Sequence, residues 1–148
     1  MIRVLLNSRV RGATPSALLK KAAQAALRGW RGDVEVSIAV VGDRRMRSLN
    51  RAALAHDYTT DVLSFHHGET PEGTLLELII CAPFAARMAK RHGLTAAQEL
   101  ARYVVHGCLH CAGHEDDTPA SRAAMWKKQE AVLRRVMGKG YVGSGEVT

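Results

Sequence analysis

The alternation of apolar and polar residues predicts four β-strands along this chain. Segments rich in Val, Ile and Leu occupy positions 2–6, 34–41, 61–65 and 74–81. The second segment begins with polar and apolar residues in turn and then becomes wholly apolar, which is typical of a strand that enters a core. Residues 66–73 are polar and contain Pro71 and Gly73, so we predict a turn there.

Longer segments, in which apolar residues recur every three or four positions, predict five helices. They cover about 15–28, 44–53, 83–93, 96–111 and 119–137. Thr95 and Gln98 have the spacing of a capping box before the fourth helix, and Thr118 followed by Pro119 begins the fifth. Because strands and helices follow one another in mixed order, we predict an α+β fold. A small four-stranded mixed sheet would pack against about five helices.

The length of the chain suits one domain. Its 148 residues are enough for one hydrophobic core and too few for two. Residues 1–137 contain no internal repeat and no linker, and we predict that they form a single catalytic domain. The last segment, 138–148, is rich in glycine and is predicted to be a disordered tail.

The end of the fourth predicted helix carries a cluster of possible metal ligands. His106 and His110 are four residues apart, which places their side chains one turn apart on the same helix face. After Gly113, which allows the chain to turn back, come His114, Glu115, Asp116 and Asp117. A lone helical histidine is usually packed or solvated. This combination instead predicts a zinc site with three protein ligands and an open fourth position.

The third ligand is expected from the segment after the turn. Asp116, ten positions after His106, is the first candidate, and His114 is the alternative. Each chain would hold one Zn²⁺ on its central helix, although nickel or iron would also suit two imidazoles and a carboxylate. Since open zinc sites are catalytic, His106, His110 and Asp116 are also the candidate catalytic residues.

The residues between the two histidines argue against two other kinds of chemistry. Zinc peptidases place a Glu beside the first histidine as general base, whereas this chain has Gly107. Cys108 and Cys111 form a Cys-x-x-Cys, but the helical period turns Cys108 away from the histidines and Cys111 toward apolar positions. We therefore predict that both cysteines are small core residues.

Three further polar residues have alternative predicted roles. Glu99 and Tyr103 share the helix stripe of the two histidines, so either could orient His106 through its second ring nitrogen. The alternative for Glu99 is a solvated side chain near the helix start. Glu77 interrupts an apolar strand, so it either faces the site or lies at a sheet edge.

The charge balance favours an anionic partner. The net charge is +7 and the pI is about 9.8, and nucleic acid is the commonest partner of such basic proteins. The alternative is a merely basic soluble protein. No apolar run is long enough to span a membrane, and Arg3 and Arg9 interrupt the first apolar segment, so we expect a cytoplasmic protein without a membrane partner. Three cysteines argue against a disulfide framework.

Two blocks of this sequence resemble the YbeY-type endoribonucleases, which are bacterial ribosomal RNA maturation factors. The first block consists of His106, Gly107, Leu109, His110 and Gly113, with a third ligand ten positions after the first histidine. The second block is Leu49-Asn50 followed by Thr60-Asp61-Val62-Leu63-Ser64-Phe65. The likeness extends over about residues 34–133.

Three positions depart from the pattern of that family. Asp116 replaces the usual histidine, although a carboxylate oxygen also binds zinc. Leu54 stands where an arginine is usual, and this arginine is thought to hold phosphate. Leu76 replaces the glycine before the acid Glu77, which would change the local backbone.

The resemblance implies a zinc-dependent endoribonuclease that cleaves single-stranded RNA. Its substrate would be precursor ribosomal RNA near the small-subunit 3′ end, with ribosomal particles as partners and a role in ribosome quality control. The candidate RNA-contacting residues are Arg44, Arg45, Arg47 and Arg51 on the short basic helix, together with Ser64 on the following strand.

Two other functions are compatible with the same residues. The chain could be a metal-dependent hydrolase of another substrate, including a peptidase whose general base lies outside the motif. It could also be a non-enzymatic ribosome-assembly factor whose metal only stabilises the fold. The sequence predicts no oligomeric state.

Overall fold

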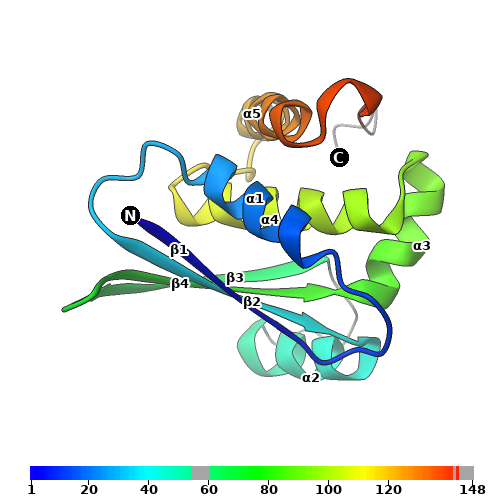
Figure 1. Ribbon diagram of the computed structural model, residues 1–148, viewed down its shortest axis with the longest axis horizontal. Helices are drawn as coiled ribbons and strands as arrows, with labels where there is room; N and C mark the ends of the chain where they lie inside the picture. The colour runs from blue at the N-terminus through cyan, green and yellow to red at the C-terminus, as the bar shows by residue number, and fades with distance from the viewer. Residues whose placement is uncertain (55–60, 142, 144–148) are drawn as a thin grey trace.

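The computed structural model describes residues 1–54, 61–141 and 143, without the side chains of residues 53 and 54 (Figure 1). Its elements are β1 (Ile2–Ser8), α1 (Ser16–Ala26), β2 (Val34–Val41), α2 (Asp43–Leu54), β3 (Val62–Thr70), β4 (Gly73–Cys81), α3 (Ala82–His92), α4 (Ala96–Cys111), α5 (Pro119–Met137) and the 3₁₀ helix η1 (Gly138–Gly140). The predicted α+β class, with four strands and five α-helices, is confirmed over the described residues. Among these helices, none has the length and apolar character needed to cross a membrane.

One mixed sheet forms the base of the fold. Its strand order is β1-β2-β4-β3. β2 runs parallel to both β1 and β4, whereas β3 runs antiparallel to β4. The two inner strands, β2 and β4, pair with a neighbour along both edges. Their side chains alternate between buried and half-buried over most of each strand and are all buried at the carboxyl end, where α2 packs on the second face. This explains why both sequences become wholly apolar toward that end.

The hairpin of β3 and β4 is longer than the sequence predicted. Residues 66–70 belong to β3: His66 pairs with Leu76 and Glu69 with Thr74, and a bulge separates the two pairs. The prediction of a turn over all of 66–73 was therefore wrong. The side chains of residues 66–70 do not alternate between apolar and polar. The segment is extended because its backbone pairs with β4, not because one of its faces is buried.

The helices lie on both faces of the sheet (Figure 1). α1 and α4 cover one face, α5 packs against α1 and α4 from outside, and α2 covers the opposite face. The larger core lies beneath α4, where Ile38, Leu78 and Val104 are fully buried. A smaller cluster on the other face packs Met46 of α2 against Ile79 of β4.

α4 is the central helix, and its ends are fixed by local contacts. At its start the Gln98 backbone N–H donates to Thr95 Oγ1 at 3.1 Å, and the Thr95 N–H donates to Gln98 Oε1 at 3.0 Å. This is the predicted capping box. The helix ends at Cys111, also as predicted, and Gly113 takes a φ of 100° in the turn that follows.

Gly107 allows α4 to approach the sheet closely. A Cβ at this position would lie 2.7 Å from Leu78 Cδ2 and 3.2 Å from Val62 Cγ2. Since side chains alternate between the two faces of a strand, Ser64 lies on the same side of β3 as Val62. Ser64 is therefore on the α4 side of the sheet.

Glu77 lies on the other face of β4. It alternates with the buried Leu76 and Leu78, and its Oε1 is 3.0 Å from His67 Nε2. Because β4 is an inner strand, both predicted places for Glu77, the site and a sheet edge, were wrong. Leu76 is fully buried and pairs with Val36 in an uninterrupted register, so the absence of the family glycine leaves this strand regular.

The first part of the predicted disordered tail is ordered. η1 covers Gly138–Gly140, and Tyr141 is only 5% exposed. The Tyr141 hydroxyl donates to Glu130 Oε1 at 2.8 Å. One aromatic side chain with a buried carboxylate partner thus fixes a segment whose glycine content suggested disorder. Residues 142 and 144–148 lie outside the described residues.

Candidate metal centre

The two histidines of α4 and one acid after its end converge in space. His106 Nε2 lies 3.3 Å from Asp116 Oδ2, and His110 Nε2 lies 3.2 Å from Asp116 Oδ1. One potential ligand atom from each of the three residues falls within 4.8 Å of the others. The imidazole planes are inclined at 75°, with centroids 5.2 Å apart. We call these three residues the His-His-Asp group.

The His-His-Asp group fits a divalent metal ion in its donor atoms and in its spacing. Zinc binds imidazole nitrogen and carboxylate oxygen at about 2.1 Å, so neighbouring ligand atoms of a tetrahedral site are about 3.4 Å apart. The two nitrogen–oxygen distances above are close to this value. The three side chains are 26%, 36% and 37% exposed, so a fourth position would be open to solvent and substrate.

Gln129 of α5 orients the ring of His106. Its Oε1 lies 2.9 Å from His106 Nδ1, and its Nε2 lies 3.5 Å from Glu130 Oε2. Only the amide nitrogen can donate to the Glu130 carboxylate, so the amide oxygen faces the imidazole. His106 therefore donates from Nδ1, which leaves Nε2, the nitrogen that faces Asp116, as the one available to a metal.

The sequence assigned this supporting role to the wrong residues. Glu99 is fully buried, but it pairs with Arg102 and with His92, whose Nδ1 is 2.8 Å from Glu99 Oε2. It is therefore neither a partner of His106 nor a solvated residue. The Tyr103 hydroxyl is buried without a hydrogen-bond partner among the described residues.

A sequence signal for Gln129 does exist. The buried residues of α5 are Met125, Gln129, Glu130, Val132, Leu133 and Val136, at helical spacing. A polar side chain on the buried face of a helix must find a buried hydrogen-bond partner, and this holds for the amide of Gln129 as for the carboxylate of Glu130. The sequence alone does not identify the partner of Gln129, because it lies 23 positions away on another helix.

Replacing Gln129 by methionine should weaken zinc binding about 10- to 100-fold, because the tautomer and orientation of His106 are no longer fixed. Competition with a zinc-sensitive chelating dye measures the affinity, and circular dichroism checks the fold. Gln24→Met, at an exposed position of α1, is the matched control and should leave the affinity unchanged. Equal affinities for both variants would contradict the role of Gln129.

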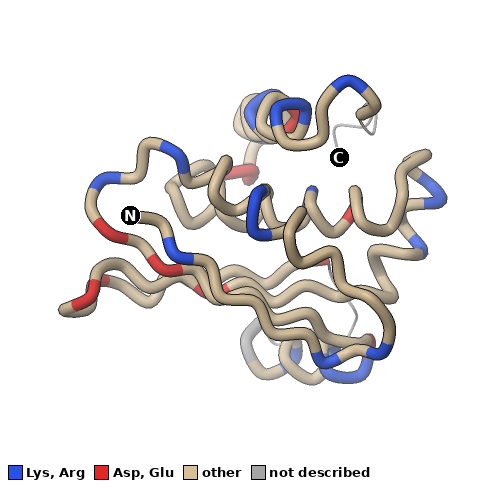
Figure 2. The backbone as a smooth tube through the Cα atoms, viewed as in Figure 1, with Lys and Arg blue, Asp and Glu red and all other residues tan. Residues whose placement is uncertain are grey.

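The other predicted site residues have different positions relative to the His-His-Asp group. His114, the alternative third ligand, is not part of it. The candidate RNA-contacting arginines Arg44, Arg45, Arg47 and Arg51 are exposed on α2, which lies across the sheet from α4 (Figures 1 and 2). Ser64 is on the α4 side. The side chain of Leu54, and Thr60 of the second sequence block, lie outside the described residues.

The two cysteines of α4 are core residues, as predicted. Cys108 is fully buried, and Cys111 packs against the core at the helix end. Burial raises the pKa of the Cys108 thiol and raises that of Cys111 to about 11. Both thiols are therefore protonated at neutral pH, which disfavours thiolate ligation and redox exchange.

Comparison with known proteins identifies similar chains. A family model described as endoribonuclease YbeY matches residues 7–137. A protein of that name from Anaeromyxobacter dehalogenans is 40% identical over 147 residues, which cover 97% of this chain and 75% of the relative. One from Moorella thermoacetica is 41% identical over 125 residues, 77% of this chain and 80% of the relative. The solution structure of a Thermotoga maritima protein matches with a TM-score of 0.64 and 29% identity, covering 95% of this chain and 91% of that one.

Proposed function

The chain belongs to the endoribonuclease YbeY family, and from this we propose that it is a zinc-dependent enzyme that cleaves single-stranded RNA. The observation that carries the proposal is the convergence of His106, His110 and Asp116 at the end of α4. We further propose that the substrate is precursor ribosomal RNA near the small-subunit 3′ end. Ribosomal particles in the cytoplasm would be the partners, and the cleavage would serve ribosome maturation and quality control.

Each residue of the site has a definite task in this proposal. His106 and His110 present Nε2, and Asp116 presents its carboxylate, to one zinc ion. Zinc held there would supply a Lewis acid that polarises a phosphate oxygen and activates the attacking group. Gln129 keeps the proton of His106 on Nδ1, away from the ligand side. The exposed side of the group admits the phosphodiester, and the net charge of +7 attracts the RNA backbone in a salt-dependent way.

Peptidase activity is disfavoured by Gly107. The general base of zinc peptidases occupies this position, next to the first histidine. Here the position not only lacks a side chain but also faces Leu78 and Val62 at distances that leave no room for one. A base for peptide hydrolysis would have to come from elsewhere in the chain.

Chelation should abolish cleavage of single-stranded RNA, and added zinc should restore it. Purified protein is incubated with labelled RNA or with casein, before chelation, after chelation and after zinc is returned. We expect RNA cleavage to be lost after chelation and to recover when zinc is returned, and we expect no cleavage of casein at any stage. His67→Ala, on the far face of the sheet from α4, is the matched histidine control and should behave as the wild type.

Two outcomes would overturn the proposed function. RNA cleavage that survives chelation would show that metal is not required or that another nuclease is present. Binding to ribosomal particles without any RNA cleavage, in protein that contains zinc, would favour the non-enzymatic assembly factor.

A further inference from the structure

A basic cleft lies next to the metal centre. Its volume is about 470 Å³, within the range of about 300–1,000 Å³ typical of small-molecule sites. Its walls come from the α1–β2 loop, the β3–β4 hairpin, the end of α4 and α5. We propose that this cleft binds one nucleobase of the RNA strand, adjacent to the phosphodiester that is cleaved. The proposal rests on the proposed ribonuclease function and specifies how its substrate is held.

An aromatic pair provides the stacking surface of the cleft. The rings of Trp30 and His66 have centroids 6.1 Å apart and planes inclined at 35°. Trp30 is half-buried against the core, and its backbone N–H donates to Leu27 O at 2.9 Å. Gly29, with a φ of 89°, makes the turn that presents the indole. A fixed aromatic face in a basic groove is the arrangement by which proteins hold single-stranded bases.

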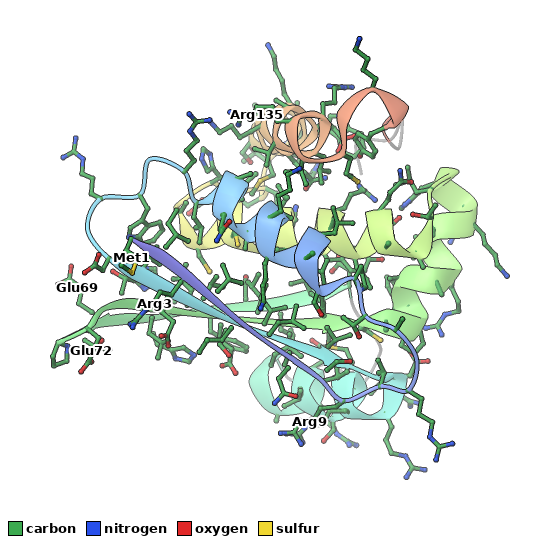
Figure 3. All side chains as sticks on the ribbon, viewed as in Figure 1. Met1, Arg3, Arg9, Glu69, Glu72 and Arg135 are labelled. Atoms are coloured by element: carbon green, nitrogen blue, oxygen red, sulfur yellow. The ribbon has the colours of Figure 1, made fainter. Side chains whose placement is uncertain are left out.

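The cleft also offers hydrogen-bonding groups for the edge of a base. The Gly68 backbone N–H donates to His66 Nδ1 at 3.1 Å, so the neutral imidazole carries its proton on Nε2 as a donor. The Glu69 carboxylate, on the β3–β4 hairpin (Figure 3), lines the same space and accepts. A donor and an acceptor in the same cleft as an aromatic ring match a base better than they match a phosphate.

The charged residues around the cleft suit the phosphates that flank such a base. Arg28, Arg31 and Lys128 line it, against the single carboxylate of Glu69. Figure 2 shows basic segments on the α1–β2 loop and along α5, which border the cleft. Long cationic side chains at the rim can follow the backbone on both sides of the base.

One short segment of chain is shared by the cleft and the metal centre. Leu109, Ala112 and His114 line the cleft, while His110 and Asp116 belong to the His-His-Asp group. Because cleft-lining residues and ligand candidates alternate along this segment, we expect a nucleotide held against Trp30 to have its neighbouring phosphodiester at the metal centre.

Trp30→Leu should weaken the binding of single-stranded RNA about 5- to 150-fold, the range for losing one stacked base. Zinc-loaded protein in excess is tested in single-turnover cleavage, in which the protein concentration at half-maximal rate reports binding. Trp30→Phe keeps an aromatic face and should lose much less of the affinity for RNA. Circular dichroism and the Tm verify that the variants are folded.

Abasic substitution separates stacking from simple charge attraction. The same RNA is made with one base removed at each position in turn. At the position that occupies the cleft, wild type and Trp30→Leu should bind equally, because there is no base to stack. The proposal is overturned if Trp30→Leu binds unmodified RNA as tightly as the wild type does. It is also overturned if the loss of affinity caused by Trp30→Leu is the same at every abasic position.

Two neighbouring lysines on α5 test the phosphate contacts. Lys128→Ala should reduce the salt dependence of binding by about one phosphate contact, whereas Lys127→Ala, which does not line the cleft, should not change it. Anisotropy of labelled RNA at several salt concentrations is measured in parallel.

A wild-type protein that binds RNA through Trp30 but never cleaves it would refute the ribonuclease function alone. RNA cleavage that is unaffected by substitution of Trp30 would refute the base-binding role of the cleft alone.

Discussion

Asp116→Ala is expected to lower the rate of RNA cleavage about 10³-fold or more, which corresponds to about 4 kcal/mol of lost transition-state stabilisation. The carboxylate lies 3.2 Å and 3.3 Å from the Nε2 atoms of His110 and His106, so its removal would take one of the three proposed ligands from the ion. Initial rates measure the loss of activity, and elemental analysis of the purified variant measures the loss of zinc. Glu115→Ala changes the neighbouring exposed acid and should leave both quantities unchanged.

Asp116→His gives the sharper comparison, because an imidazole nitrogen also binds zinc and a histidine is usual in this place in the resembling family. We expect this variant to retain zinc and to keep activity within about tenfold of the wild type. The rank order wild type, Asp116→His, Asp116→Ala is specific to a ligand role. If Asp116→Ala keeps its zinc while His114→Ala loses it, the third ligand is His114 instead.

The parts of the site that follow from local geometry could be predicted from the sequence. The capping box and the glycine turn determine the ends of α4, and the observed bounds, Ala96–Cys111, agree with the prediction. Once the helix is fixed, a spacing of four brings His106 and His110 to one face. The short turn after α4 restricts where the next residues can lie. The proximity of Asp116 to the two histidines could therefore be predicted from the spacing.

The parts that depend on distant packing could not be predicted in this way. Gln129 reaches His106 only because α5 packs against α4, and Trp30 meets His66 only because the α1–β2 loop lies beside the hairpin. The basic helix α2 looked like part of the site from its composition. The direction in which the chain crosses the sheet, which composition does not encode, instead puts α2 on the far face.

Gly107→Glu is expected to destabilise the fold by at least about 3 kcal/mol, and it should not create a peptidase. The first added carbon would lie 2.7 Å from Leu78 Cδ2, and the carboxylate would follow it into an interface of apolar side chains. Overpacking alone costs about 1–3 kcal/mol, and burial of an unpaired charge adds to it. Urea denaturation measures the free energy of unfolding. Gly140→Glu, where an added Cβ meets no atom within 4 Å, is the control.

Gly107→Ala separates overpacking from charge, and two opposing effects decide its result. Alanine improves the intrinsic helix propensity by about 1 kcal/mol. The contact with Leu78 opposes this gain, and since a leucine methyl can move by a few tenths of an ångström, we expect a net loss of only about 1 kcal/mol. Leu78→Val shortens the opposing side chain, so Gly107→Ala should cost less in that background than alone. Additive effects of the two substitutions would mean that the close approach of α4 to β4 does not explain the need for glycine at this position.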